Sequence, residues 1–285
     1  MAAGHDTPEK AVRISEVACK SALTGEKGSY RLNPYVGCPH RCAYCYASYM
    51  SRWKGEGSWG TWVHVKVNVP EVLKKELSRP SFFGETSVFI STVCDPYQPL
   101  ERRYRLTRRC LEVLSEAASS GMPLRVMVAT KSDLALRDID VFRTFPEGAF
   151  GLAFSITTHR DDVAAYVEHF APRPSRRIEA ARILKDAGVR VGFFICPVLP
   201  YVTERDLGGL LDIAGELKLD FLSFDRLNYL RGHVGGRAFQ AYRSLGQEAL
   251  RRLEQARDDP RYERRLKERI LREAARRELT AECHF

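Results

Sequence analysis

Three cysteines lie within eight residues of one another, at Cys38, Cys42 and Cys45, in the spacing C-x3-C-x2-C. Thiolates are soft ligands that favour zinc, copper(I) and iron–sulfur clusters. A structural zinc site takes four protein ligands, and the nearest candidates for a fourth are His40 and the more distant His64. An iron–sulfur cubane held by three cysteines keeps one iron open to a substrate or cofactor. The triplet therefore favours a reactive iron–sulfur site, with a Cys3His zinc site as the structural alternative.

The elements that must position this triplet alternate about six times between strand and helix patterns, which predicts a parallel sheet with crossover helices. The β-branched and aromatic runs that predict strands cover residues 30–36, 86–92, 124–130, 150–158, 189–199 and 220–224. The patterns that predict helices cover residues 69–78, 107–119, 134–145, 174–187 and 204–217. From about residue 239, two charged helical segments follow, broken at residues 258–260.

Polar side chains follow the predicted strands at the points where they end. Asp95 follows the second strand, Lys131 the third, Ser155 and Thr157 end the fourth, and Cys196 ends the fifth. In parallel α/β folds the ligand site lies at the carboxyl ends of the strands. We therefore expect these side chains to gather on one face, together with the cysteine triplet.

The composition is that of a globular α/β protein. The chain has 285 residues, of which 44% are hydrophobic, and a formal net charge of +9. It has no apolar run of 18 residues and no apolar signal-peptide core near its start, so we expect a cytoplasmic protein without a membrane span. We expect a leader packed on the barrel over residues 1–28, a barrel domain over 29–228 and a basic helical extension over 229–285.

The sequence around the cysteines resembles that of a known family. The triplet with an aromatic residue, Tyr44, before its last cysteine resembles the signature of radical S-adenosylmethionine (SAM) enzymes. More blocks resemble the spore photoproduct lyase-like branch, often labelled DNA repair photolyases, and the likeness spans about residues 19–228. These blocks are LNPYVGCPHRCAYCYA (32–47), WGTWVHVKVNVPEVLKKEL (59–77), STVCDPYQPLE (91–101), TKSDLALRD (130–138), SITT (155–158) and PSRRI (174–178).

The resemblance implies a partial (β/α)6 TIM-type barrel with parallel strands, in agreement with the six alternations, followed by a helical C-terminal extension. It implies a [4Fe–4S] cluster on Cys38, Cys42 and Cys45, with SAM bound to the open iron. One electron then cleaves SAM, and the resulting 5′-deoxyadenosyl radical abstracts hydrogen from a substrate. It also implies a reducing partner protein such as a flavodoxin or a ferredoxin.

The resemblance also implies roles for the residues at the strand ends. Asp95 would accept a hydrogen bond from the methionine amino group of SAM, and Lys131 would pair with its carboxylate. Ser155 and its same-face neighbour Thr157 would bind the ribose hydroxyls. On local grounds alone, Asp95 could instead form an Asx-turn before Pro96, Lys131 could be a solvated loop residue, and Ser155 could bond to backbone.

Tyr44 or Tyr46 would lie against the adenine or its sugar, and Tyr46 is also a candidate catalytic residue. In spore photoproduct lyase, a cysteine three residues before the aspartate donates hydrogen to the product radical. That position is Thr92 here, which puts the repair of thymine photoproducts in doubt. Cys94 is the replacement candidate for a hydrogen donor, although a small buried side chain is the favoured interpretation.

For two further cysteines, Cys196 and Cys283, a structural role is favoured over a catalytic one. Cys196 is a second thiol candidate on the barrel face, for which core packing is favoured. Cys283, the third residue from the end of the sequence, is expected to lie in an exposed tail.

A basic segment follows the second strand, where Arg102, Arg103 and Arg105 are candidate contacts to an anion or substrate. Beside Tyr97 and Tyr104 they could hold a phosphate backbone and stack bases, or bind an anionic small molecule or peptide. A small molecule or peptide is favoured over nucleic acid as the unidentified substrate. The alternative to an enzyme is a non-catalytic basic nucleic-acid-binding module with a structural zinc.

Overall fold

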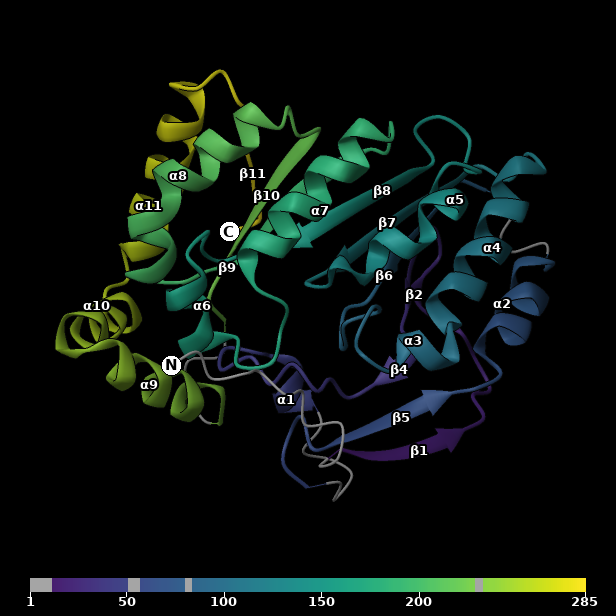
Figure 1. The fold of residues 1–285 in the computed structure, drawn as a ribbon, viewed down its shortest axis with the longest axis horizontal. Coiled ribbons are helices and arrows are strands. Elements are labelled where there is room, and N and C mark those ends of the chain that lie inside the picture. The colour runs from purple at the N-terminus through teal and green to yellow at the C-terminus, as the bar shows by residue number, and fades with distance from the viewer. Residues whose placement is uncertain (1–11, 51–56, 80–83, 229–232) are drawn as a thin grey trace.

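The computed structural model describes residues 12–50, 57–79, 84–228 and 233–285. Within these residues, eight strands form the main sheet in the order β11-β10-β9-β8-β7-β6-β3-β2 (Figure 1). All neighbours in this sheet are parallel except the antiparallel pair β2 and β3. The strands are β2 (Leu23–Glu26), β3 (Ser29–Leu32), β6 (Thr86–Ile90), β7 (Leu124–Thr130), β8 (Phe150–Ser155), β9 (Val191–Val198), β10 (Phe221–Arg226) and β11 (Glu282–Cys283).

The sheet curls into a partial barrel. Phe89 of β6 and Phe194 of β9 stack with ring centroids 5.7 Å apart, although β7 and β8 lie between their strands. Two side chains separated by two strands can meet only across the concave face of a curved sheet. With β2 and β11 at its two edges, the barrel of the described residues stays open. The expected partial barrel of parallel strands is confirmed.

Crossover helices cover the convex face of this sheet (Figure 1). β8 is buried at every residue, as expected for a central strand with a covered outer face. The helices of the barrel are α2 (Val69–Leu77), α3 (Glu101–Tyr104), α4 (Leu106–Ser119), α5 (Ile139–Phe142), α6 (Asp161–Val167), α7 (Pro174–Asp186) and α8 (Val202–Glu216), with a 3-10 helix at Asp133–Asp138. The single helix expected over 134–145 is therefore two short pieces.

The first expected strand, 30–36, is divided between two sheets. Its first part is β3 of the main sheet, whereas β4 (Tyr35–Val36) joins a three-stranded sheet with β1 (Arg13–Val17) and β5 (Trp62–Lys66). The break falls at Asn33 and Pro34. Proline has no N–H group to donate to a neighbouring strand. The side-chain oxygen of Asn33 accepts hydrogen bonds from the backbone N–H groups of Thr92 and Val93. The described part of residues 1–28 thus supplies strands to both sheets.

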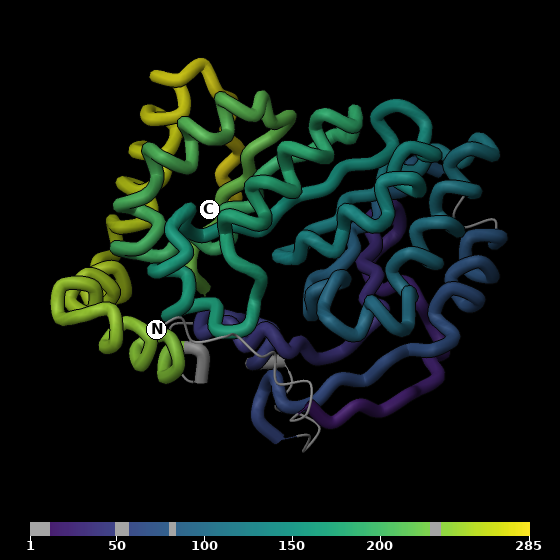
Figure 2. Tube along the Cα trace, viewed as in Figure 1, coloured from purple at the N-terminus to yellow at the C-terminus, as the bar shows by residue number. Residues whose placement is uncertain are grey.

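The C-terminal part forms three helices among the described residues, where two were expected. They are α9 (His233–Leu245), α10 (Gln247–Asp258) and α11 (Tyr262–Ala275). Gly246 adopts a φ of +114°, which ends α9 and starts α10 at a sharp turn. The chain then returns as β11 beside β10, which Figure 2 shows as a yellow segment near the marked C-terminus. The expectation of an exposed tail at Cys283 is therefore wrong, because its backbone pairs with the sheet edge.

No helix among the described residues is long and apolar enough to cross a membrane.

Candidate active site at the strand ends

The cysteine loop begins directly after β4. Gly37 there has a φ of +95°, and a Cβ at this position would lie 2.4 Å from the Trp62 carbonyl oxygen. Cys38 and Cys42 are buried and Cys45 is half-buried. Burial raises the pKa of all three thiols, and Cys42 and Cys45 further raise the pKa of Cys38 by charge repulsion. The three thiols therefore lie close enough for the charge on one to affect the pKa of another.

The three thiols are soft donors of the kind that iron–sulfur clusters take. Among the described residues, no three His, Cys, Asp or Glu side chains converge on a point where one metal ion could bind. A cubane meets three thiolates through three different irons, so its ligands are spread around it. Positive charge also lies nearby, since Lys131 lowers the pKa of Cys42 and Cys45 against the effect of burial. Cations of this kind favour the thiolate form that metal binding needs.

Asp95 joins the ends of β6 and β7. Its carboxylate accepts the backbone N–H of Lys131 at 2.7 Å, the hydroxyl of Thr130 at 2.7 Å and the backbone N–H of Tyr97 at 2.9 Å. The imidazole Nδ1 of His40 lies 3.6 Å from the same carboxylate. The Tyr97 contact closes the Asx-turn that the local sequence suggested. Asp95 therefore links two strand ends and lies beside His40 of the cysteine loop.

Lys131 reaches from the end of β7 to the end of β8. Its ammonium donates to the Ser155 hydroxyl at 2.6 Å and lies 5.6 Å from the centre of the Tyr44 ring. Of the described residues, no carboxylate forms a salt bridge with Lys131. The strand-end residues Asp95, Lys131 and Ser155 thus form one connected chain of contacts beside the cysteine loop.

Two buried residues that the sequence interpretation gave no role complete this region. Glu168 accepts the hydroxyls of Tyr44 and Thr157 and pairs with Arg177, which also donates to the Ser155 carbonyl oxygen at 3.0 Å. Burial acts to raise the pKa of Glu168, but Arg177 and Lys131 hold it below its ordinary value. Arg177 is the second of the two arginines in the PSRRI block, so that block held the signal for its importance.

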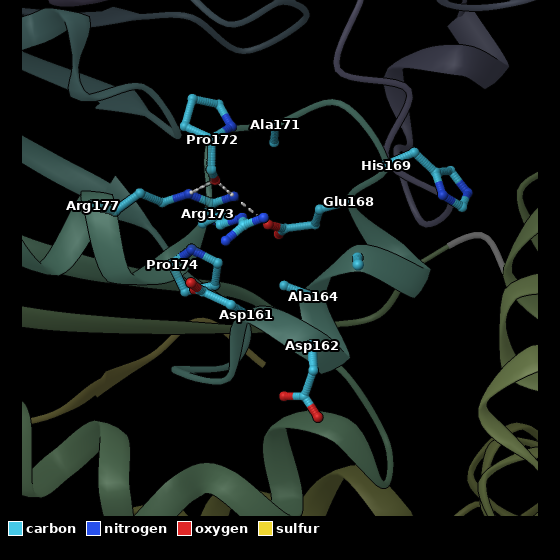
Figure 3. Close-up of a pocket in the computed structure, with 11 residues that line it drawn as sticks. Asp161, Asp162, Ala164, Glu168, His169, Ala171, Pro172, Arg173, Pro174 and Arg177 are labelled. Carbon is cyan, nitrogen blue, oxygen red and sulfur yellow. Dashed lines mark hydrogen bonds and ion pairs between the residues drawn. The ribbon is translucent and has the colours of Figure 1, made fainter. Parts of the chain in front are cut away.

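The Glu168 and Arg177 pair also lines a cavity of about 350 Å³ between α6 and α7 (Figure 3). In Figure 3 the two side chains meet beside the Pro172 carbonyl group, which accepts a hydrogen bond from Arg177. Asp162 and His169 lie at the margin of the cavity. The Thr157 hydroxyl is buried and directed to Glu168.

The candidate hydrogen donors separate in space. The Cys94 thiol faces Ser91 and Asn33, with sulfur to oxygen distances of 3.7 Å and 3.9 Å, and burial raises its pKa to about 12. Tyr46 is 42% exposed, and its hydroxyl donates to the carbonyl oxygen of Thr92. Tyr46 therefore contacts the backbone of Thr92, the position of the donor cysteine in spore photoproduct lyase. The Cys94 thiol instead contacts Ser91 and Asn33.

The remaining candidates lie around this centre. Cys196 is half-buried on β9, and its thiol donates to the Ser223 carbonyl oxygen at 3.6 Å. Arg102 is exposed and lines a second cavity of about 450 Å³ that also reaches His40 of the cysteine loop. Arg103 and Arg105 are exposed but do not line that cavity, and Arg103 lies over the ring of its neighbour Tyr104.

Comparison with known proteins identifies relatives over most of the chain. An uncharacterized protein of Methanocaldococcus jannaschii is 32% identical over 222 residues, which cover 76% of this chain and 78% of the relative. An uncharacterized protein of Mycobacterium tuberculosis is 34% identical over 204 residues, which cover 68% of this chain but only 58% of that longer protein.

Solved structures share the fold at low sequence identity. A spore photoproduct lyase in complex with a dinucleoside spore photoproduct has a TM-score of 0.70 at 17% identity, covering 95% of this chain and 82% of that one. SuiB of Streptococcus suis, bound to its precursor peptide SuiA, has a TM-score of 0.63 at 14% identity and covers 92% of this chain and 50% of that one.

The family match covers the cysteine loop and most of the barrel. The sequence model described as the Radical SAM superfamily matches residues 32–214, which is more than half of the chain. That region contains the cysteine triplet and each of the strand-end residues described above. On these grounds the chain belongs to the radical SAM superfamily.

Proposed function

We propose that this protein is an enzyme that holds a [4Fe–4S] cluster through Cys38, Cys42 and Cys45 and uses SAM to abstract hydrogen from a substrate. The observation that carries the proposal is the chain of contacts from the cysteine loop through Asp95 and Lys131 to Ser155. When bound, the cluster supplies the electron that cleaves SAM to methionine and a 5′-deoxyadenosyl radical. Family membership supports SAM and an iron–sulfur cluster as the cofactors.

Lys131 is prepared to receive the methionine carboxylate. Its ammonium is already oriented by Ser155 and by the Tyr44 ring, so little side-chain freedom is lost on binding. Asp95 already accepts two backbone N–H groups and is the acceptor that we assign to the methionine amino group. Both groups then recognise the two ends of one amino acid moiety.

We assign Ser155 to the ribose hydroxyls of SAM, and we assign the Tyr44 ring to a contact with the adenosine part. The Thr157 hydroxyl donates to Glu168 at 3.2 Å, so in this proposal Thr157 contributes to the ribose site together with that carboxylate. Glu168 also orients the Tyr44 hydroxyl. The pair with Arg177 keeps Glu168 ionised and therefore able to accept both hydroxyls.

For the substrate we favour a small molecule or a peptide over damaged DNA. Thr92 stands where the lyase resemblance calls for a donor thiol, and the Cys94 thiol faces Asn33 and Ser91. Tyr46, whose hydroxyl contacts the Thr92 carbonyl, is the candidate catalytic residue that faces the outside of the cysteine loop. A flavodoxin or ferredoxin is the proposed class of electron donor.

Anaerobic reconstitution tests the proposal. The wild-type protein and Cys42→Ala would be purified without oxygen, supplied with iron and sulfide, and reduced with dithionite in the presence of SAM. We expect wild-type protein to hold iron and sulfide and to release methionine and 5′-deoxyadenosine, both quantified by mass spectrometry, and Cys42→Ala to release neither. Zinc in place of iron, with no cleavage by either protein, would contradict the proposal and favour the nucleic-acid-binding module.

A further inference from the structure

A helix from the C-terminal part of the chain reaches the cysteine loop. α9 packs against α1 (Ala47–Met50), the short helix that follows Cys45 (Figure 1). From α9, Arg237 donates through one guanidinium nitrogen to the Cys45 carbonyl oxygen at 3.1 Å and to the Ser48 hydroxyl at 2.5 Å. Arg237 and Cys45 are 192 positions apart. α9 also lies beyond residue 214, where the match to the superfamily ends.

Arg237 is a cation without an acidic partner among the described residues. It is half-buried, and no carboxylate in the described part of the chain forms a salt bridge with it. Burial lowers its pKa, and the groups that act in the opposite direction are the Cys45 and Cys42 thiols. Removing an arginine from water without a counter-charge is costly, so an anion at the cysteines would offset this cost.

Two other cations near the triplet already have assigned contacts. Arg177 is paired with Glu168, and Lys131 is bonded to Ser155 at the position that we assign to the SAM carboxylate. Arg237 contacts the loop from the C-terminal part of the chain, and its hydrogen bonds to Cys45 and Ser48 both go to neutral oxygen atoms. The positive charge of Arg237 can therefore stabilise negative charge on the three thiolates and their cluster.

We propose that Arg237 is a positioning residue that holds the Cys45 loop and, through its charge, raises the reduction potential of the cluster. This inference rests on the proposed function. A cubane with three thiolate ligands carries net negative charge, which increases when one electron is added. A fixed cation beside it stabilises the reduced form more than the oxidised form, and partial burial strengthens this effect. Charge and hydrogen bonding around the sulfur atoms are known determinants of such potentials.

The test measures the midpoint potential of the reconstituted full-length protein, without SAM or substrate, by redox titration followed by electron paramagnetic resonance. Arg237→Gln removes the charge and Arg237→Lys keeps it while losing the planar guanidinium group. Arg243→Gln is the matched control, because Arg243 lies exposed on the same helix. Iron and sulfide per chain are measured for every variant.

We expect Arg237→Gln to hold iron and to be harder to reduce by at least about tenfold in the equilibrium constant, which is 59 mV for one electron. Arg237→Lys should shift less, and Arg243→Gln should match the wild type. An unchanged midpoint in Arg237→Gln would overturn the inference. Loss of iron from both Arg237 variants would also overturn it, because the residue would then serve assembly instead of potential. Wild-type protein without iron would instead refute the proposed function.

Discussion

The Arg177 guanidinium meets the Glu168 carboxylate at 2.5 Å, and neither side chain has more than 3% of its surface exposed. Arg177 also donates to two backbone carbonyl groups, of Ser155 and Pro172. Glu168 uses its other oxygen for the hydroxyls of Tyr44 and Thr157. One ion pair thus joins the cysteine loop, the end of β8 and the start of α7, and its loss should affect both stability and the site.

Removing one partner of this pair should destabilise the protein strongly. Arg177→Met leaves the Glu168 carboxylate buried without its counter-charge, and we expect it to lower the free energy of unfolding by about 3–5 kcal/mol. Arg182→Met is the control on the same helix, because Arg182 is half-exposed and pairs with Glu179 and Asp186 in water. It should cost at most about 1 kcal/mol. Denaturant unfolding of the metal-free protein measures both, and equal effects would contradict the assigned importance of the buried pair.

The same pair predicts a dependence of stability on acid. Despite burial, Arg177 and Lys131 hold the folded-state pKa of Glu168 below its ordinary value, which is about 4.3 in the unfolded chain. The contribution of Glu168 to stability is therefore complete above that pH and is lost as the pH falls through the folded-state pKa. We expect the free energy of unfolding to fall more steeply below about pH 5 in wild-type protein than in Glu168→Gln. Parallel curves from denaturant unfolding across this range would refute the prediction.

Lys131 should control SAM affinity without controlling iron content. Lys131→Met removes a charged hydrogen-bond donor worth about 1.5–3 kcal/mol, so we expect the dissociation constant for SAM to rise by about 10- to 150-fold. Lys74→Met is the control, because Lys74 is 67% exposed on α2. Equilibrium dialysis of the anaerobic, reconstituted proteins measures the affinity, and iron per chain should stay at the wild-type value. An unchanged dissociation constant in Lys131→Met would remove Lys131 from the proposed SAM site.

The cysteines should divide into ligands and non-ligands. Cys38→Ala and Cys45→Ala should lose most of the bound iron, because each removes one of the three thiolates that hold the cluster. Cys94→Ala and Cys196→Ala should keep it, since the Cys94 thiol contacts Ser91 and Asn33 and the Cys196 thiol contacts the Ser223 carbonyl. Iron and sulfide analysis after reconstitution checks all four. Loss of iron from Cys94→Ala would place that thiol among the ligands.

Much of the barrel could be predicted from local patterns. The strands at 86–90, 124–130 and 150–155 and the helix at 174–186 lie within a few residues of their predicted ranges. A run of β-branched residues or an amphipathic period is a property of neighbouring residues, so it is visible without the tertiary structure. The division of 30–36 was missed because it depends on Asn33 reaching a loop that lies 59 positions away in the sequence.

The sequence by itself determined the cysteine triplet, the alternation of strands and helices, and the polar residues at the strand ends. Each of these is encoded by residues that are close together along the chain. The tertiary structure alone decided that Glu168 receives Tyr44 from 124 positions away and that Arg237 reaches Cys45 from 192 positions away. Contacts over such separations depend on how the whole barrel curls and where α9 packs. No local pattern specifies them, because their energy is gained only when distant elements have already come together.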